Sequence, residues 1–185
     1  MNSCDEDKIS VELMKPRILI AGIGNIFLQD DGFGVEVARR LASEPLPEGV
    51  RVADFGIRGV HLAYEILDGG YEAVILVDAA PRGEKAGTVY LIEPDLEAAS
   101  DEALLSLDAH GMDPRVVLEM LKSLGGACER IYIVGCEPQE TEEGIGLSAP
   151  VTQGVEEAIS MVRNIVSSVS DEDSAGSLRE EFAKR

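Results

Sequence analysis

The residues best suited to chemistry in this chain are two adjacent carboxylates that follow a glycine turn. In the stretch ILIAGIGNIFLQDDGFGVEVARRL, residues 18–41, Asp30 and Asp31 come just before a predicted helix. A further acid, Asp78, follows the aliphatic run AVILV, and His110 lies in a polar loop. Carboxylate oxygens with one imidazole suit a divalent ion, and the imidazole favours a first-row transition metal over calcium. We therefore expect a cation site built from Asp30 or Asp31, Asp78 and His110.

Each of these residues also has an ordinary structural interpretation. An acid at a helix start is more often a cap than a ligand, and a single loop histidine usually has no function. The other histidine, His61, lies near the start of a predicted helix and is expected at the surface. Three protein ligands would leave coordination positions open, so either the ion exchanges or another molecule completes its shell.

A nucleotide site is the main alternative for the glycine turn. Gly22-x-Gly24 after a strand, with Asp54 ending the next strand, resembles a dinucleotide-binding fingerprint. However, Phe27 stands where a third glycine is expected, and the seven residues NIFLQDD separate the glycines from the helix. The helix N-terminus therefore cannot lie over a pyrophosphate, and the paired acids would repel one. A dinucleotide-binding domain is the weaker interpretation.

The elements that must position these residues alternate along the chain. Apolar runs predict strands and amphipathic segments predict helices, which together predict an α/β sheet covered by helices on both faces. One antiparallel pairing is expected, because no helix separates the third strand from the fourth. In such sheets ligands bind at the carboxyl ends of the strands, where the candidate acids fall. The predicted strands are 17–21, 50–53, 73–77, 88–92 and 130–134, and the predicted helices are 33–42, about 62–67, 96–107, 114–124 and 150–169.

Composition limits the partners and the location. The 185 residues suit one domain, expected over 16–169 after a flexible leader, 1–15, and before a polar tail, 170–185, that is disordered or a frayed helix. The net charge of −19 disfavours nucleic acid and anionic lipid as partners. The first 16 residues lack the apolar core of a signal peptide, and no apolar run approaches the length needed to span a bilayer. Cys4, Cys128 and Cys136 form no CxxC pair. A cytoplasmic protein is expected, with Cys136 in a structural role.

The motifs in order resemble a known family. Gly22-Ile23-Gly24-Asn25, followed after four residues by Asp30-Asp31-Gly32-Phe33-Gly34-Val35, is similar to the N-terminal motif of the hydrogenase maturation proteases. The resemblance continues at Asp78, His110, Gly135-x-x-Pro138 and Gly146-Leu147-Ser148, and covers about residues 17–169. The family fold is a three-layer sandwich, a twisted, mostly parallel five-stranded sheet between helices.

The resemblance also implies roles for individual residues. It places the metal-binding positions on Asp31, Asp78 and His110, and so selects Asp31 over Asp30. Some relatives carry Glu in place of Asp31, and the turn Gly56-Ile57-Arg58-Gly59 departs from their small-residue turn, which affects substrate fit. The implied supporting loop comprises Gly22, Gly24, Asn25, Asp30 and Gly32. In it, Asn25 is expected to fix the loop, Asp30 to cap the helix, and the glycines to leave room for a close approach by the substrate.

The implied activity is removal of a C-terminal extension from a nickel-loaded hydrogenase large-subunit precursor. The nickel would arrive with that precursor, so no tightly held metal is expected in the enzyme itself. Peptide hydrolysis would use Asp31 and Asp78, and the family is often called aspartic-type although no aspartic dyad motif is visible here. A non-catalytic nickel-binding checkpoint protein with the same ligands is the alternative.

Overall fold

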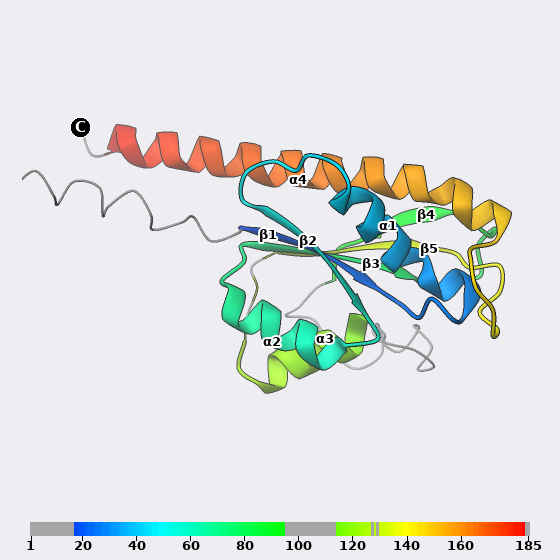
Figure 1. Cartoon of the computed structure of the whole chain (residues 1–185). Helices are drawn as coiled ribbons and strands as arrows, with labels where there is room; N and C mark the ends of the chain where they lie inside the picture. The colour runs from blue at the N-terminus through cyan, green and yellow to red at the C-terminus, as the bar shows by residue number, and fades with distance from the viewer. Residues whose placement is uncertain (1–16, 95–113, 127, 129, 184–185) are drawn as a thin grey trace, which may run out of the picture.

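The chain folds around one five-stranded sheet with helices on both faces (Figure 1). The computed structural model describes residues 17–94, 114–126, 128 and 130–183, without the side chains of 115 and 172–183. The sheet order is β2-β1-β3-β5-β4, with neighbouring strands parallel except for β4, which runs antiparallel to β5 at one edge. The strands are β1 Ile18–Ile23, β2 Val50–Gly56, β3 Ala73–Ala79, β4 Val89–Ile92 and β5 Arg130–Cys136.

The helices form the two outer layers. α1 and α4 cover one face of the sheet and α2 and α3 cover the other (Figure 1). This arrangement confirms the predicted three-layer α/β sandwich and its mostly parallel sheet. The helix expected over 96–107 lies outside the described residues. The helical elements are the 3-10 helix η2 Gln29–Gly32, α1 Phe33–Ala42, α2 Gly59–Gly69, α3 Pro114–Ser123 and α4 Ala149–Ala183.

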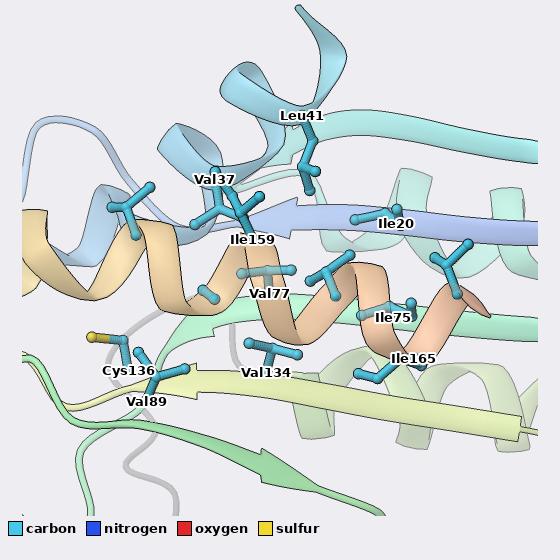
Figure 2. Packing of buried hydrophobic residues seen from close by; sticks show 14 of the residues in the cluster. Ile20, Val37, Leu41, Ile75, Val77, Val89, Val134, Cys136, Ile159 and Ile165 are labelled. Carbon is cyan, nitrogen blue, oxygen red and sulfur yellow. The ribbon is translucent and has the colours of Figure 1, made fainter. Parts of the chain in front are cut away.

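Two hydrophobic cores fix the sheet between the helical layers. Successive strand side chains point to opposite faces, so β3 sends Ile75 and Val77 toward α1 and α4 and sends Leu76 toward α2 and α3. Figure 2 shows Val37 of α1 and Ile159 of α4 over the first of these faces. Because β1 and most of β3 are buried on both sides, their sequences are aliphatic runs instead of alternating patterns.

Helix α1 packs unusually close to the sheet, and this contact positions the loop before it. A Cβ atom added at Gly34 would lie 2.0 Å from the Val77 carbonyl oxygen and 2.4 Å from that of Ile23. The Gly34 backbone therefore packs directly against the last residues of β1 and β3. The residues just before it, including Asp31, are consequently held at the edge of the sheet where Asp78 follows Val77.

The last helix is longer than the sequence indicates. Helix α4 was expected to end near residue 169, and Val169 is its last side chain known to be buried, yet the helix continues to Ala183. In the part of the chain that the structure describes, no helix combines the length and apolar character needed to cross a membrane.

Candidate functional site

The strand register gathers acidic residues at the carboxyl edge of the sheet. Gly22 of β1 is paired with Asp54 of β2 on one side and with Val77 of β3 on the other. Asp78, one residue further along β3, is paired with Gly135 of β5 and is only 6% exposed. Asp54 and Asp78 therefore lie near the carboxyl ends of β2 and β3, the two strands that flank β1, and both fall at strand ends as the sequence predicts.

Asp31 is held at this edge with one carboxylate oxygen engaged. The Asn25 backbone N–H donates to Asp31 Oδ2 at 2.6 Å, whereas Oδ1 has no hydrogen bond to any residue that the structure describes. Asp31 is half-buried, and this burial raises the pKa of its carboxyl while the Asn25 N–H acts to lower it. A half-buried carboxylate with one uncommitted oxygen is well suited to meet a cation.

The glycine turn brings Asp31 into place by close backbone packing. Gly24 has φ +126, and a Cβ there would lie 1.8 Å from the Asp31 carbonyl oxygen. A Cβ on Gly22 would lie 2.3 Å from the Gly34 carbonyl oxygen, and one on Gly32 would lie 3.2 Å from the Ile26 Cα atom. The prediction that these glycines make room for a substrate is therefore wrong, because the chain's own backbone fills that room.

Asn25 fixes the loop as predicted. Its side-chain Oδ1 accepts the Phe27 N–H at 3.0 Å, a local Asx-type turn, while its own N–H holds Asp31. Two residues further on, Gln29 adopts φ +48, a left-handed backbone conformation that is uncommon without glycine. Backbone strain of this kind is often found beside functional sites.

Asp30 does not cap helix α1, contrary to the prediction. The helix begins at Phe33, its N-cap residue is Gly32, and no side chain accepts its free N–H groups. Instead, η2 turns the fully buried Asp30 into the loop of residues 139–148. Its Oδ2 accepts the N–H groups of Gln139 (2.9 Å) and Glu140 (3.1 Å), and Ser148 donates its N–H to Oδ1 (2.6 Å) and its hydroxyl to Oδ2 (2.9 Å).

A third buried carboxylate, Glu137, was missed by the sequence reasoning. It is 6% exposed and accepts the backbone N–H groups of Arg82 (2.7 Å) and Gly83 (3.2 Å). It thereby ties the end of β5 to the loop between β3 and β4, close to Asp78. The available signal was weaker than for Asp78: Glu137 is an acid three residues beyond the predicted strand 130–134, whereas Asp78 directly follows the predicted strand 73–77.

Cys136 behaves as a structural residue. Burial, with the nearby negative charges of Asp30 and Glu137, raises the pKa of its thiol to about 12. Its sulfur lies under α4, where a Cβ on Gly154 would be 3.3 Å away. A thiol that stays protonated at neutral pH is a poor nucleophile, so this residue packs the core.

The proposed ligand trio is only partly visible. Asp31 and Asp78 both lie at the carboxyl edge, and His110 lies outside the described residues. Within the described ranges, no three His, Cys, Asp or Glu side chains form a cluster that could hold a metal ion. His61 is exposed on α2, as predicted. Whether His110 completes the trio therefore stays a prediction.

Comparisons with known proteins agree with this architecture. The family model described as HycI, hydrogenase maturation protease, matches residues 35–165. A candidate hydrogenase maturation protease of Methanocaldococcus jannaschii is 33% identical over 153 residues, 81% of this chain and 96% of the relative. The hydrogenase 2 maturation protease of Escherichia coli is 30% identical over 149 residues, 79% of this chain and 88% of the relative. The solved E. coli hydrogenase maturating endopeptidase HybD is 27% identical, with a TM-score of 0.68, over 83% of this chain and 93% of that structure.

The fold and site define a three-layer α/β protein with carboxylates at the carboxyl ends of its parallel strands. With the family match over residues 35–165, the chain belongs to the hydrogenase maturation protease family. It is therefore a hydrolase, an endopeptidase of hydrogenase maturation, and the resemblance seen in its motifs is confirmed.

Proposed function

We propose that this protein removes the C-terminal extension of a hydrogenase large-subunit precursor after nickel has been installed in that precursor. The observation that carries the proposal is the pair of acids, Asp31 and Asp78, at one sheet edge in a chain of this protease family. The relative in E. coli is named as the maturation protease of hydrogenase 2, and we extend that kind of substrate to this chain.

The donor set suits nickel that arrives as part of the substrate. Asp31, in η2 after β1, offers Oδ1, and Asp78 lies at the end of β3, the strand paired with β1. Two carboxylates can therefore approach an ion from the protein side. His110 is proposed as the third donor, since an imidazole favours a first-row transition metal. Three donors leave coordination positions for ligands of the precursor itself, and the enzyme needs no resident metal.

In this proposal the bound nickel acts mainly as an anchor. Holding the precursor by its metal places the scissile peptide bond beside the carboxylates. Such positioning lowers the activation barrier of hydrolysis, because the reacting groups are already close and oriented. One of the two carboxylates, Asp31 or Asp78, then accepts a proton from the water that attacks the peptide carbonyl. The enzyme is in this sense aspartic-type.

The cytoplasm is the proposed location of this reaction. In the described part of the chain Cys128 and Cys136 are buried thiols, and neither forms a disulfide with another described residue. Free thiols suit a reducing compartment, where precursor thiolates would also remain available to nickel.

The first prediction tests cleavage and the three ligands together. The purified protein should shorten a nickel-loaded large-subunit precursor, and leave the nickel-free precursor intact, when the product mass is followed by mass spectrometry. Asp31→Ala, Asp78→Ala and His110→Ala should each lower kcat/KM by about 100-fold or more, because each removes a positioning or proton-accepting group.

Exposed residues of the same types provide matched controls for that experiment. His61→Ala and Asp68→Ala should cleave at the wild-type rate, since both side chains are exposed on α2. Binding of the loaded precursor without shortening would instead identify a checkpoint protein. Wild-type cleavage by all three ligand variants would show that the site has been assigned wrongly.

A further inference from the structure

The most exposed apolar side chains of the described residues are concentrated at one edge of the molecule. Ile145 is 83% exposed, Phe27 63% and Ile57 61%, whereas no other exposed large apolar side chain exceeds 49%. Single exposed apolar residues are common on soluble proteins. These three, which we call the apolar rim, all lie in loops at the carboxyl edge, where Asp31 and Asp78 also lie.

The contacts between the loops make the apolar rim one surface. Phe27 and Ile57 line the same cavity of about 290 Å³, together with Gly24 and Asn25 of the glycine turn. On the other side, the Gly144 N–H donates to the Phe27 carbonyl at 2.9 Å, and Ile145 is the next residue. The glycine turn therefore lies in the middle of the rim, beside the Asp31 carboxylate that it holds.

Each loop of the rim is held in place by a polar side chain. Asn25 accepts the Phe27 N–H. Arg58 donates to the carbonyls of Asp54 (2.5 Å) and Phe55 (3.0 Å), which fixes the turn that carries Ile57. Asp30 binds both ends of the 139–148 loop that carries Ile145. Ordering of surface loops on binding costs affinity, and these loops are already ordered.

The loop that carries Ile145 is also strongly acidic. Glu140, Glu142 and Glu143 are exposed, and none of them forms an ion pair with another described residue. Their carboxylates lie within five residues of Ile145 along the chain. A partner that covers the rim must therefore bring apolar side chains to its centre and positive charge to this flank.

We propose that the apolar rim is the surface on which the precursor polypeptide docks, through a segment with apolar side chains flanked by Lys or Arg. This inference rests on the proposed function, because it takes the hydrogenase large-subunit precursor as the occupant. The rim surrounds the proposed cleavage site, so docking there brings the precursor's metal and scissile bond toward Asp31. It also assigns substrate recognition to residues separate from the three metal ligands.

Kinetics on rim variants test the proposal. Phe27→Ser, Ile57→Ser and Ile145→Ser should each raise KM for the nickel-loaded precursor about tenfold, the size expected for central interface residues. Their kcat should stay within about twofold of wild type, because the carboxylates are untouched. The matched control, Leu124→Ser, removes an apolar side chain that is 42% exposed after α3 and should leave both constants unchanged.

The charged flank gives an independent measurement. The Glu142→Lys/Glu143→Lys double variant should raise KM several-fold, and its KM should depend less on salt than that of wild type, because screening acts on the removed attraction. An unchanged KM in the three rim variants would overturn the proposal, as would an equal effect of Leu124→Ser.

A binding measurement separates failure of the rim from failure of the proposed function. The nickel-free precursor, which should remain uncut, is titrated into the wild-type protein and into the Ile145→Ser protein. Weaker binding with Ile145→Ser supports the rim even if the wild-type protein proves unable to cleave, an outcome that would reject only the proposed function. Equal binding by the two proteins rejects the rim even if wild-type cleavage is normal.

Discussion

The two adjacent acids of the glycine loop have opposite surroundings. Asp30 is fully buried and accepts four hydrogen bonds from one loop, whereas Asp31 is half-buried and keeps one oxygen uncommitted. The sequence predicts that an acid pair lies here, but not which acid points inward. That depends on η2, where neighbouring side chains are about 120° apart, and on a loop more than 100 residues away in sequence.

The burial of Asp31 predicts that Asp31→Asn changes the stability of the protein. Since its pKa is raised in the folded protein, the folded state holds this proton more tightly than the unfolded state does. Ionisation of Asp31 therefore destabilises the fold as pH rises from about 3.8 through the raised value, and the full cost is present at neutral pH. Asp31→Asn should raise Tm by a few degrees at pH 7, while cleavage of the precursor is lost.

The control for that change must remove one negative charge elsewhere. Asp171→Asn does so at an exposed position of α4, and corrects for relief of the net charge of −19. The extra stability of Asp31→Asn over Asp171→Asn should shrink as the pH is lowered toward 4. Tm is measured by calorimetry. If the two variants had equal Tm values at pH 7, burial of the ionised Asp31 carboxylate would not destabilise the fold.

At the scale of elements, the site depends on loops tied together across the carboxyl edge. Asp30 fastens residues 139–148 to η2, and Glu137 fastens the β3–β4 loop to β5. A buried carboxylate is tolerated here because backbone N–H groups replace its water. These two side chains hold the loop that follows β3 and the loop that follows β5.

Removing the first of these links should loosen its loop strongly. Asp30→Ala leaves the N–H groups of Gln139, Glu140 and Ser148 without their acceptor. Because each unsatisfied group costs about 1–3 kcal/mol, the free energy of unfolding should fall by about 3–5 kcal/mol. Ser148→Ala removes only the hydroxyl bond and should cost about 1–2 kcal/mol. Urea unfolding followed by circular dichroism measures both, and equal losses would show that the backbone bonds to Asp30 contribute little.

Most helices and strands could be predicted from the sequence, because local apolar patterns determine them. Ala73–Ala79 is an aliphatic run because β3 is central and covered on both faces. The antiparallel partner of β4 was not predictable: β4 follows β3 in the chain but pairs with β5, and no local signal encodes that choice. Likewise, sequence patterns place Ile57 and Ile145 in loops without showing that those loops meet at one edge.

The described residues form one sheet with two hydrophobic cores, and the first part of α4 packs into one of these cores. Its buried side chains run from Val151 to Val169, all within the core shared with α1. The domain boundary expected near residue 169 stays a prediction; Val169 is the last buried side chain of α4 among those that the structure describes. The sequence indicates this boundary because the apolar repeat stops there, whereas continued helix is compatible with the polar residues that follow.

A chain shortened after Asp171 tests that boundary. Because every known buried contact of α4 is retained, its Tm should stay within about 3 °C of wild type, and cleavage should be unchanged. Shortening after Asn164 instead removes Ile165, Val166 and Val169 from the core and should lower Tm by 10 °C or more, since each large apolar deletion costs about 2 kcal/mol or more. A large loss of stability on the first truncation would place the boundary further along.

Helix α4 begins beside the 139–148 loop and runs 35 residues, about 50 Å, away from it (Figure 1). Its far end lies past the opposite edge of the sheet from Asp31 and Asp78. An attachment point beyond Ala183 is therefore well separated from the carboxyl edge where Asp31 and Asp78 lie. The protein can be immobilised on a sensor surface or fused to a fluorophore at the end of α4, with the apolar rim proposed to dock the precursor left open to solution.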